Sequence, residues 1–170
     1  MNTARDGGRG GGLRLELRPT SPADREFLYQ VYAGTRAEEL AVVDWPAATI
    51  DAFLRQQFEA QDHHYRRNYP GATFDVIVVD GQRAGRLYVQ QMADETRVMD
   101  IALLPAYRGQ GVGKRVLGDV LAAAGARGVG VTIHVERNNR ALPWYQRLGF
   151  SLAGDRGVYL FLRWLPASEV

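Results

Sequence analysis

The stretch Asp100-Ile-Ala-Leu-Leu-Pro-Ala-Tyr-Arg-Gly-Gln-Gly-Val-Gly-Lys114 decides how the rest of the chain is organised. Its first part continues a short apolar run up to Leu104, which is typical of a strand buried on both faces. Pro105 ends that strand, because proline has no N–H to donate to a strand ladder. Beyond the glycines, apolar residues recur with a helical period from Val112 to Ala124. The sequence therefore predicts a strand, a glycine turn and a helix.

The glycine turn is a candidate anion cradle. Gly111 and Gly113 have no Cβ, so a ligand can approach the backbone closely and positive φ angles cost little. The first turn of the following helix has N–H groups without intrahelical partners, and these attract an anion. Arg108 and Lys114 add positive charge beside it. A phosphate cradle and a plain tight connection both fit these residues.

Two familiar phosphate loops are excluded by their spacing. A Walker A loop needs a glycine where Arg108 stands and a hydroxyl where Arg115 stands. The dinucleotide fingerprint needs a third glycine at Val116 or at Lys114, depending on where it starts.

Two segments instead resemble one known family. Arg108-Gly-Gln-Gly-Val-Gly113 is similar to the acyl-CoA signature of the GCN5-related N-acetyltransferases (GNAT), and it follows a strand ending in proline. Asn138-Asn-Arg-Ala-Leu-Pro-Trp-Tyr-Gln-Arg-Leu-Gly-Phe150 resembles that family's asparagine, alanine, tyrosine and glycine–phenylalanine segment. The two blocks lie in the family's order, with a predicted strand between them. Together they span about a third of the chain.

The resemblance implies the α/β (α+β) GNAT fold, a mixed and mostly antiparallel sheet of about seven strands with about four flanking helices. It implies acetyl-CoA as co-substrate and a small-molecule or peptidyl primary amine as acceptor, which attacks the thioester directly in a ternary complex. Backbone groups along the strand would follow the pantetheine arm, and those of the turn would hold the pyrophosphate. An N–H of Leu103 or Leu104 would polarise the thioester carbonyl. The implied cofactor-binding residues are Ile101, Ala102, Leu103, Arg108, Gly109, Gln110, Gly111, Val112, Gly113, Lys114, Tyr145 and either Asn138 or Asn139. The two asparagines have an alternative role, because either could simply cap the following helix.

The remaining patterns predict the other elements in chain order. Residues 1–12 are glycine-rich and are expected to be a disordered tail, and residues 13–166 are expected to form a single domain. Strands are predicted at 13–19, 73–79, 84–91, 96–104, 130–135, 150–153 and 158–164, and helices from about 22 to 35, 46 to 69, 112 to 124 and 138 or 139 to 148.

Composition narrows the class of protein. The 170 residues include no cysteine, so there is no disulfide, thiolate nucleophile or cysteine–zinc site. The net charge of +2 is too small to argue for nucleic acid, and three scattered histidines predict no metal site. No apolar run reaches membrane-spanning length and no secretory signal is seen, so we expect a cytoplasmic protein. Residues 1–100 carry 12 basic and 15 acidic side chains, whereas residues 101–170 carry 9 basic and 4 acidic ones. The acidic first part suits a cationic substrate and the basic second part suits a polyanionic cofactor, although ordinary scatter of surface charge explains the counts equally well.

Acetyl transfer to an amine requires a neutral nitrogen and a proton for the departing thiolate. Deprotonating a lysine-like amine at pH 7 costs about 4–5 kcal/mol, so a base within hydrogen-bond reach helps. Tyr145 stands at the position of the family's tyrosine, and a phenol protonated at pH 7 can deliver a proton to the sulfur. Packing of its ring against the sheet is the alternative role.

The base is the least determined part of the site. His134 lies on the fifth predicted strand, where some family members have a glutamate, and histidine accepts protons near neutral pH. Asp100 on the preceding strand is a second candidate, because a carboxylate among apolar residues must be solvated, paired or functional. The resemblance places residues 36–40 at a substrate-facing wall, where Glu38 and Glu39 are candidates to receive a cationic amine, or form part of a solvated face. His63 and His64 are expected at the surface.

Three alternatives stay open. A non-catalytic acyl-CoA-binding sensor of the same fold would keep the same cradle, although an intact Tyr145 favours an enzyme. Transfer of a longer acyl chain depends on cavity depth, which the sequence does not show. A homodimer with strands pairing across its interface is also compatible with the sequence.

Overall fold

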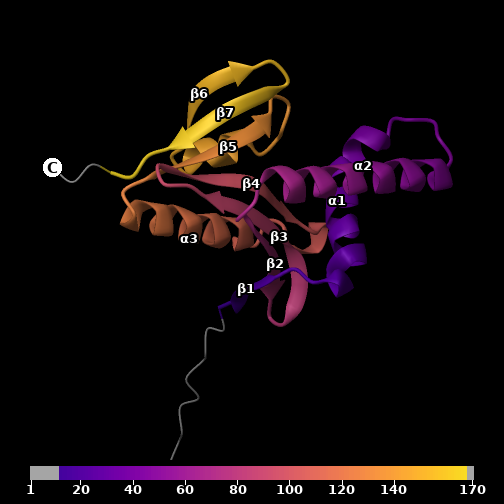
Figure 1. The fold of residues 1–170 in the computed structure, drawn as a ribbon. Helices are drawn as coiled ribbons and strands as arrows, with labels where there is room; N and C mark the ends of the chain where they lie inside the picture. The colour runs from indigo at the N-terminus through magenta and orange to yellow at the C-terminus, as the bar shows by residue number, and fades with distance from the viewer. Residues whose placement is uncertain (1–11, 168–170) are drawn as a thin grey trace, which may run out of the picture.

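The computed structural model describes residues 12–167. Within this range the chain forms one seven-stranded sheet, with strand order β1-β2-β3-β4-β5-β7-β6, and four helices (Figure 1). Neighbouring strands are antiparallel except β4 and β5, which are parallel, so the sheet is mixed and mostly antiparallel as predicted. The predicted tail at 1–12 lies outside the described residues except for Gly12. The elements are β1 (Leu15–Pro19), α1 (Arg25–Leu40), α2 (Ala47–Asn68), β2 (Thr73–Val79), β3 (Gln82–Gln91), β4 (Glu95–Leu103), α3 (Val112–Ala126), β5 (Gly130–Glu136), α4 (Leu142–Arg147), β6 (Ser151–Arg156) and β7 (Tyr159–Trp164).

Apolar cores cover the two faces of the sheet. On one face, α1 and α2 pack on β2, with Val31, Phe58 and Val76 buried between them. On the other face, α3 packs on β4 and β5, and its buried side chains include Val116 and Leu117. The layers are visible in Figure 1, where α3 lies on the opposite side of the sheet from α1. Removing this apolar surface from water is the main force holding the layers together.

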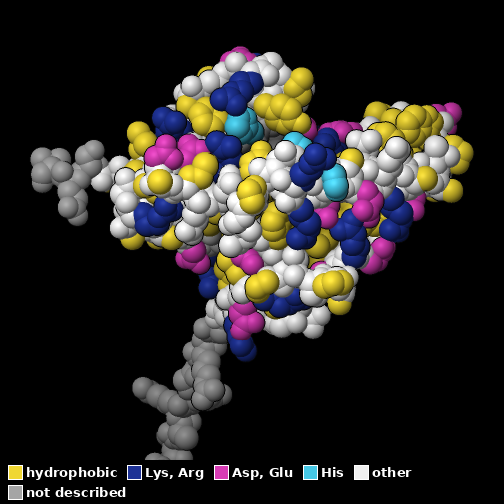
Figure 2. Space-filling model, viewed as in Figure 1, with side chains coloured by type: hydrophobic (Ala, Val, Ile, Leu, Met, Phe, Trp, Pro, Cys, Tyr) yellow, Lys and Arg dark blue, Asp and Glu magenta, His cyan; other side chains and the backbone are white. Residues whose placement is uncertain are grey.

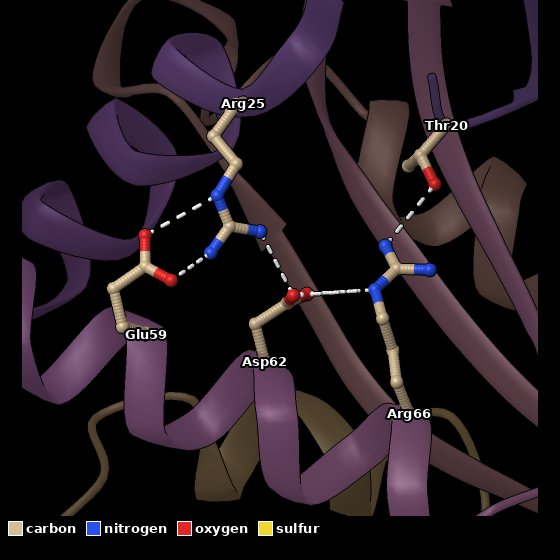
Figure 3. Close-up of polar contacts among 5 residues, drawn as sticks. All are labelled: Thr20, Arg25, Glu59, Asp62 and Arg66. Carbon is tan, nitrogen blue, oxygen red and sulfur yellow. Dashed lines mark hydrogen bonds and ion pairs between the residues drawn. The ribbon is translucent and has the colours of Figure 1, made fainter. Parts of the chain in front are cut away.

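A charged network also ties α1 to α2 (Figure 3). Arg25 on α1 donates to Asp62 at 2.8 Å and is paired with Glu59, and both acids are on α2. Arg66 donates to the same Asp62 carboxylate at 3.2 Å and reaches Thr20 Oγ1 at 3.5 Å. Asp62 is buried, and the two guanidiniums provide hydrogen bonds to both of its carboxylate oxygens.

Charged and hydrophobic side chains are distributed unequally over the outer surface of α1 and α2 (Figure 2). Basic and acidic side chains interleave on the face shown, whereas hydrophobic side chains gather at the end of the molecule where the α1–α2 connection lies. There Val42 is 87% exposed, and Trp45 and Phe53 make an edge-to-face contact with ring centroids 5.7 Å apart.

Several predicted boundaries were wrong by one or more residues: β1 begins at Leu15 instead of residue 13 and β3 at Gln82 instead of residue 84, and the larger differences lie in α1, α4 and β6. Helix α1 continues to Leu40 instead of ending near Thr35, because Arg36–Leu40 consists of good helix formers. Helix α4 begins at Leu142, since the Asn139 side chain accepts a hydrogen bond from Ala141 N at 2.8 Å and forms a turn first. Strand β6 begins at Ser151 instead of Phe150, which is buried in the core, and it continues to Arg156, so the hairpin turn is shorter than predicted.

Strand β4 also differs from the prediction of burial on both faces. Its residues from Met99 to Leu103 are only half-buried. Ile101 and Leu103 pack against the core under α3, while the other face of this segment opens into a cavity. One face of this apolar segment therefore packs against the core, and the other face lines the cavity.

Candidate active site

The cavity forms where two parallel strands separate. Residues Glu95–Val98 of β4 pair with Gly130–Ile133 of β5, and the pairing stops there although both strands continue. On the other side of β4, Tyr88 pairs with Asp100 and Val89 with Val98, so Met99 is an extra residue that bulges the strand. A bulge bends its strand and increases the local twist. The diverging strand ends border a cavity of about 230 Å³.

The edge of β4 that faces this gap has backbone groups without a strand partner. Leu104 N donates to Ala84 O at 2.8 Å, so this N–H is committed to β3. Alternate residues of an antiparallel strand point their N–H groups to opposite edges. The N–H groups of Ile101 and Leu103 therefore point away from β3 and toward β5. The Leu103 N–H remains a candidate to polarise a thioester carbonyl, whereas the Leu104 N–H is no longer one.

The glycine turn continues directly from this edge. Gly109 and Gly111 have φ of 72° and 80°, which is left-handed backbone that glycine adopts without strain. A Cβ at either position would meet nothing within 4 Å, so the outer side of the turn is open. The first N–H of α3 with a helical partner is that of Arg115, which donates to Gly111 O at 3.1 Å. The earlier N–H groups, Val112 to Lys114, are free to bind an anion.

The side chains of the turn support the backbone. Arg108 Nε donates to Leu103 O at 3.0 Å, and Gln110 Nε2 donates to Ala106 O at 2.7 Å. Lys114 is exposed and makes no ion pair with any residue in 12–167. Arg108 and Gln110 thus hold the loop in shape, and Lys114 is left as a mobile positive charge beside it.

Tyr145 reaches the cavity from α4. Its side chain is 5% exposed and its ring packs against Trp144 and Phe150. Among the described residues none hydrogen-bonds to its hydroxyl. Burial, and then the nearby charge of Asp100, raise the pKa of Tyr145 well above its ordinary value. The phenol consequently keeps its proton throughout the physiological pH range and is available as a donor.

His134 also lines the cavity, from β5. Its Nε2 lies 2.9 Å from Arg156 Nη1, and because arginine only donates, Nε2 must accept. Burial lowers the pKa of His134, and the charges of Arg156 and Arg97 lower it further. The imidazole is therefore neutral at pH 7. The lone pair that a base would use is occupied by Arg156 in this arrangement, and Nδ1 carries the proton.

Asp100 forms the floor of the cavity as half of an ion pair. Arg86, which is 2% exposed, donates to its two carboxylate oxygens at 3.0 and 2.9 Å and to Gln61 at 3.0 Å. A carboxylate held on both oxygens by a buried guanidinium is poorly placed to accept a proton as well. The geometry gives Asp100 a structural role at the floor.

The two pairs of neighbouring candidates are separated by the fold. Asn139 lines the cavity and Asn138 does not; both are exposed. Glu39 lines the cavity, whereas Glu38 pairs with Arg140 at 3.2 Å outside it. His63 and His64 are exposed, as predicted.

Sequence reasoning missed several residues of this cavity. Glu136 at the end of β5 and Arg86 on β3 line it, together with Tyr32, Thr35, Gln61, Tyr65, Met99, Ile133, Val135 and Tyr159. Arg36 on α1 also lines it, within the segment 36–40 that the family resemblance placed at a substrate-facing wall. Glu136 lies two residues before the second family-like segment, so its place at the end of a strand was a usable signal. Within residues 12–167 no group of acids and histidines is arranged to hold a metal ion.

Comparisons with known proteins identify the family. Residues 70–152 match the family model described as an acetyltransferase (GNAT) domain. The chain is 34% identical over 116 residues to the uncharacterized protein ML0378 of Mycobacterium leprae, covering 68% of this chain and 29% of that protein. It is 32% identical over 84 residues to the ribosomal protein bS18 alanine N-acetyltransferase of Haemophilus influenzae, covering 49% of this chain and 58% of that one. The chain thus spans well under two thirds of these relatives.

Solved structures share the fold. The PaiA N-acetyltransferase of Thermoplasma acidophilum, in complex with coenzyme A, has a TM-score of 0.69 at 18% identity, covering 89% of this chain and 99% of that one. The ribosomal protein S18 alanine N-acetyltransferase of Escherichia coli has a TM-score of 0.62 at 16% identity, covering 92% and 97%. The chain belongs to the GNAT acetyltransferase family. None of the helices between residues 12 and 167 has the length and apolar character that crossing a membrane requires.

Proposed function

We propose that residues 13–166 form one catalytic domain that transfers the acetyl group of acetyl-CoA to a primary amine by direct attack in a ternary complex. One observation supports the proposal: the open edge of β4 and Tyr145 border the same cavity, and the glycine turn follows β4 directly in the chain. The family's use of acetyl-CoA and of amine acceptors supports it.

The residues present fit coenzyme A. A Cβ at Gly109 or Gly111 would occupy the open side of the turn, which the structure leaves clear for a pyrophosphate beside the unpaired N–H groups. The N–H groups of Ile101 and Leu103 would hold the pantetheine arm, and Asn139 is better placed than Asn138 to assist. Acetyl-CoA supplies the activated acyl group when bound.

The chain's own groups would divide the proton transfers. Tyr145 would protonate the departing sulfur, because it lines the cavity and its buried hydroxyl keeps its proton and has no hydrogen-bond partner among the described residues. Removal of the amine proton falls to a solvent molecule or to His134 after Arg156 moves from its Nε2. Asp100 is committed to Arg86 and is the weaker candidate.

Tyr145→Phe tests this function. The variant removes a hydroxyl that has no partner in the described protein, so we expect little change in stability or in coenzyme A affinity. We expect turnover of the best amine in a panel to fall by about 10²-fold or more, measured as thiol release. Tyr69→Phe is the matched control, because Tyr69 does not line the cavity.

Unchanged turnover in Tyr145→Phe would remove Tyr145 from the mechanism. Tight binding of coenzyme A by the wild type, without turnover of any amine, would favour a non-catalytic sensor.

A further inference from the structure

Three charged side chains, connected by hydrogen bonds, lie at the solvent-exposed mouth of the cavity. Arg36 on α1 donates to Glu39, one turn further along the helix, at 3.1 and 3.2 Å. The same guanidinium donates to Glu136 at the end of β5 at 3.3 Å. All three residues line the cavity. Two carboxylates from different elements therefore converge on one cation.

The charges lining this cavity do not balance. Arg86 and Asp100 neutralise each other through two hydrogen bonds at the floor. His134 is neutral at pH 7, because burial and the charge of Arg156 lower its pKa. Arg36 can neutralise only one of its two carboxylates, so the lining carries one uncompensated negative charge. A cationic ligand gains from that charge and an anionic ligand loses.

The carboxylates of Glu39 and Glu136 are more exposed to solvent than Tyr145, the proposed proton donor. The Tyr145 side chain is 5% exposed, whereas the side chains of Arg36, Glu136 and Glu39 are 30%, 37% and 56% exposed. The cation site is consequently at the mouth, and the proton donor is inside. The amine nitrogen that reacts beside Tyr145 therefore cannot also contact the carboxylates at the mouth. Only a second cationic group on the same acceptor could bind there.

An aromatic ring completes the cation site. The Arg36 Cζ lies 5.9 Å from the centroid of the Tyr32 ring, within the range of a cation–π contact. Tyr159 and Tyr65 line the same cavity. Tyrosine rings beside carboxylates bind ammonium groups well, because the ring face and the carboxylate both attract the cation.

We propose that the acceptor is a primary amine carrying a second cationic group, and that Glu39 and Glu136 bind this second group at the mouth in exchange for Arg36. The inference rests on the acetyltransferase function proposed above. The exchange is inexpensive, since partly exposed ion pairs contribute only about 0–1 kcal/mol each. The opposite reading, with Arg36 holding an acceptor's carboxylate, would put that carboxylate beside two others.

Three amines of equal length separate these readings. Cadaverine has an ammonium group at its far end, and two analogues replace that group by a hydroxyl or by a carboxylate. Binding to the full chain is measured by calorimetry with and without coenzyme A, so no turnover is required. We expect cadaverine to bind at least about tenfold more tightly than the amino alcohol, and the amino acid to bind most weakly.

Variants of the mouth locate the effect. Glu136→Gln, and the double variant Glu39→Gln/Glu136→Gln, should bring the cadaverine and amino alcohol affinities together. Arg36→Gln should tighten cadaverine binding, because it removes the competing cation. Glu26→Gln is the matched control: Glu26 is also on α1 and is paired with an arginine, Arg55, at 2.9 Å, but it does not line the cavity. It should keep the wild-type preference.

Equal affinities for cadaverine and the amino alcohol in the wild type would overturn the inference, as would tighter binding of the carboxylate analogue. A cadaverine preference that survives in Glu136→Gln would overturn it too, and Glu136→Gln retains most of the mouth if the double variant does not fold. Failure of the proposed function looks different: thiol release would be absent for all three amines, whatever their order of affinity.

Discussion

The glycine turn and the acceptor cavity adjoin the same strand, yet they are built in opposite ways. The turn from Arg108 to Lys114 is one continuous segment that presents backbone N–H groups. The cavity is assembled from side chains of α1, α2, β3, β4, β5, α4 and β7, and its floor is a buried ion pair. The backbone site depends on local conformation, and the side-chain site depends on distant elements arriving together. We therefore expect that separate substitutions can disrupt the proposed cofactor binding at the turn and the proposed acceptor recognition in the cavity.

The floor of the cavity should show the largest effect. Asp100→Asn keeps the shape but leaves Arg86, 2% exposed, as an uncompensated buried charge. We expect the free energy of unfolding to fall by about 3 kcal/mol, measured by urea denaturation. Glu59→Gln, which breaks a largely exposed pair with Arg25, should cost less than about 1 kcal/mol.

The double variant Arg86→Met/Asp100→Leu sharpens this result. Replacing both charges by apolar side chains should recover much of the lost stability. Turnover by the recovered protein would exclude Asp100 as the base. Unchanged stability in Asp100→Asn combined with lost turnover would instead assign Asp100 to the chemistry and contradict its structural role at the floor of the cavity.

The glycine turn should show an intermediate effect, on cofactor affinity and on stability. In Gly111→Val, a branched side chain is placed at φ of 80° and on the open side of the turn. We expect coenzyme A to bind at least about tenfold more weakly, because the side chain projects where the phosphates would lie, and stability to fall by about 1–2 kcal/mol. Calorimetry measures the first and urea denaturation the second.

Gly118→Val is the control within the same helix. Gly118 also has open space around its Cβ position but a helical φ, so coenzyme A affinity should be unchanged. A normal dissociation constant in Gly111→Val would contradict the placement of the pyrophosphate at this turn.

The smallest expected effect is the pH dependence contributed by His134. Its pKa is lowered in the folded protein, first by burial and then by Arg156, so the unfolded chain binds a proton more readily. The corresponding stability is present above the unfolded pKa near ~6.5 and is lost as the pH falls through it toward the folded value. Wild type should therefore lose more stability than His134→Gln between pH 7 and pH 5, measured by urea denaturation at each pH. Parallel loss in the two proteins would show that His134 is not held neutral.

Particular residues show how far sequence reasoning reached. Gly111 and Tyr145 stand in short segments whose spacing already indicated their places, and both lie at the cavity or its adjoining turn. Glu39 and Asn139 were proposed together with neighbours, and only the fold separated them from Glu38 and Asn138. Arg86 carried no local signal strong enough to propose, because nothing near it in sequence shows what it faces.

Gly85 shows the same limit in the backbone. A Cβ at Gly85 would lie 2.2 Å from Ala102 O, so β3 and β4 can run together there only with glycine. No pattern around Gly85 indicated this contact, because its partner is distant in the chain.

The amino-acid sequence by itself determined the elements and their order, the glycine turn and the tyrosine segment. Hydrophobic periodicity, proline and glycine act over a few residues, so their consequences can be read locally. Only the tertiary structure decided where β4 and β5 separate, that Asp100 is held by Arg86, and that Arg36 lies between Glu39 and Glu136. These are contacts between groups up to 100 residues apart, and the charge that each side chain meets depends on the packing of whole elements.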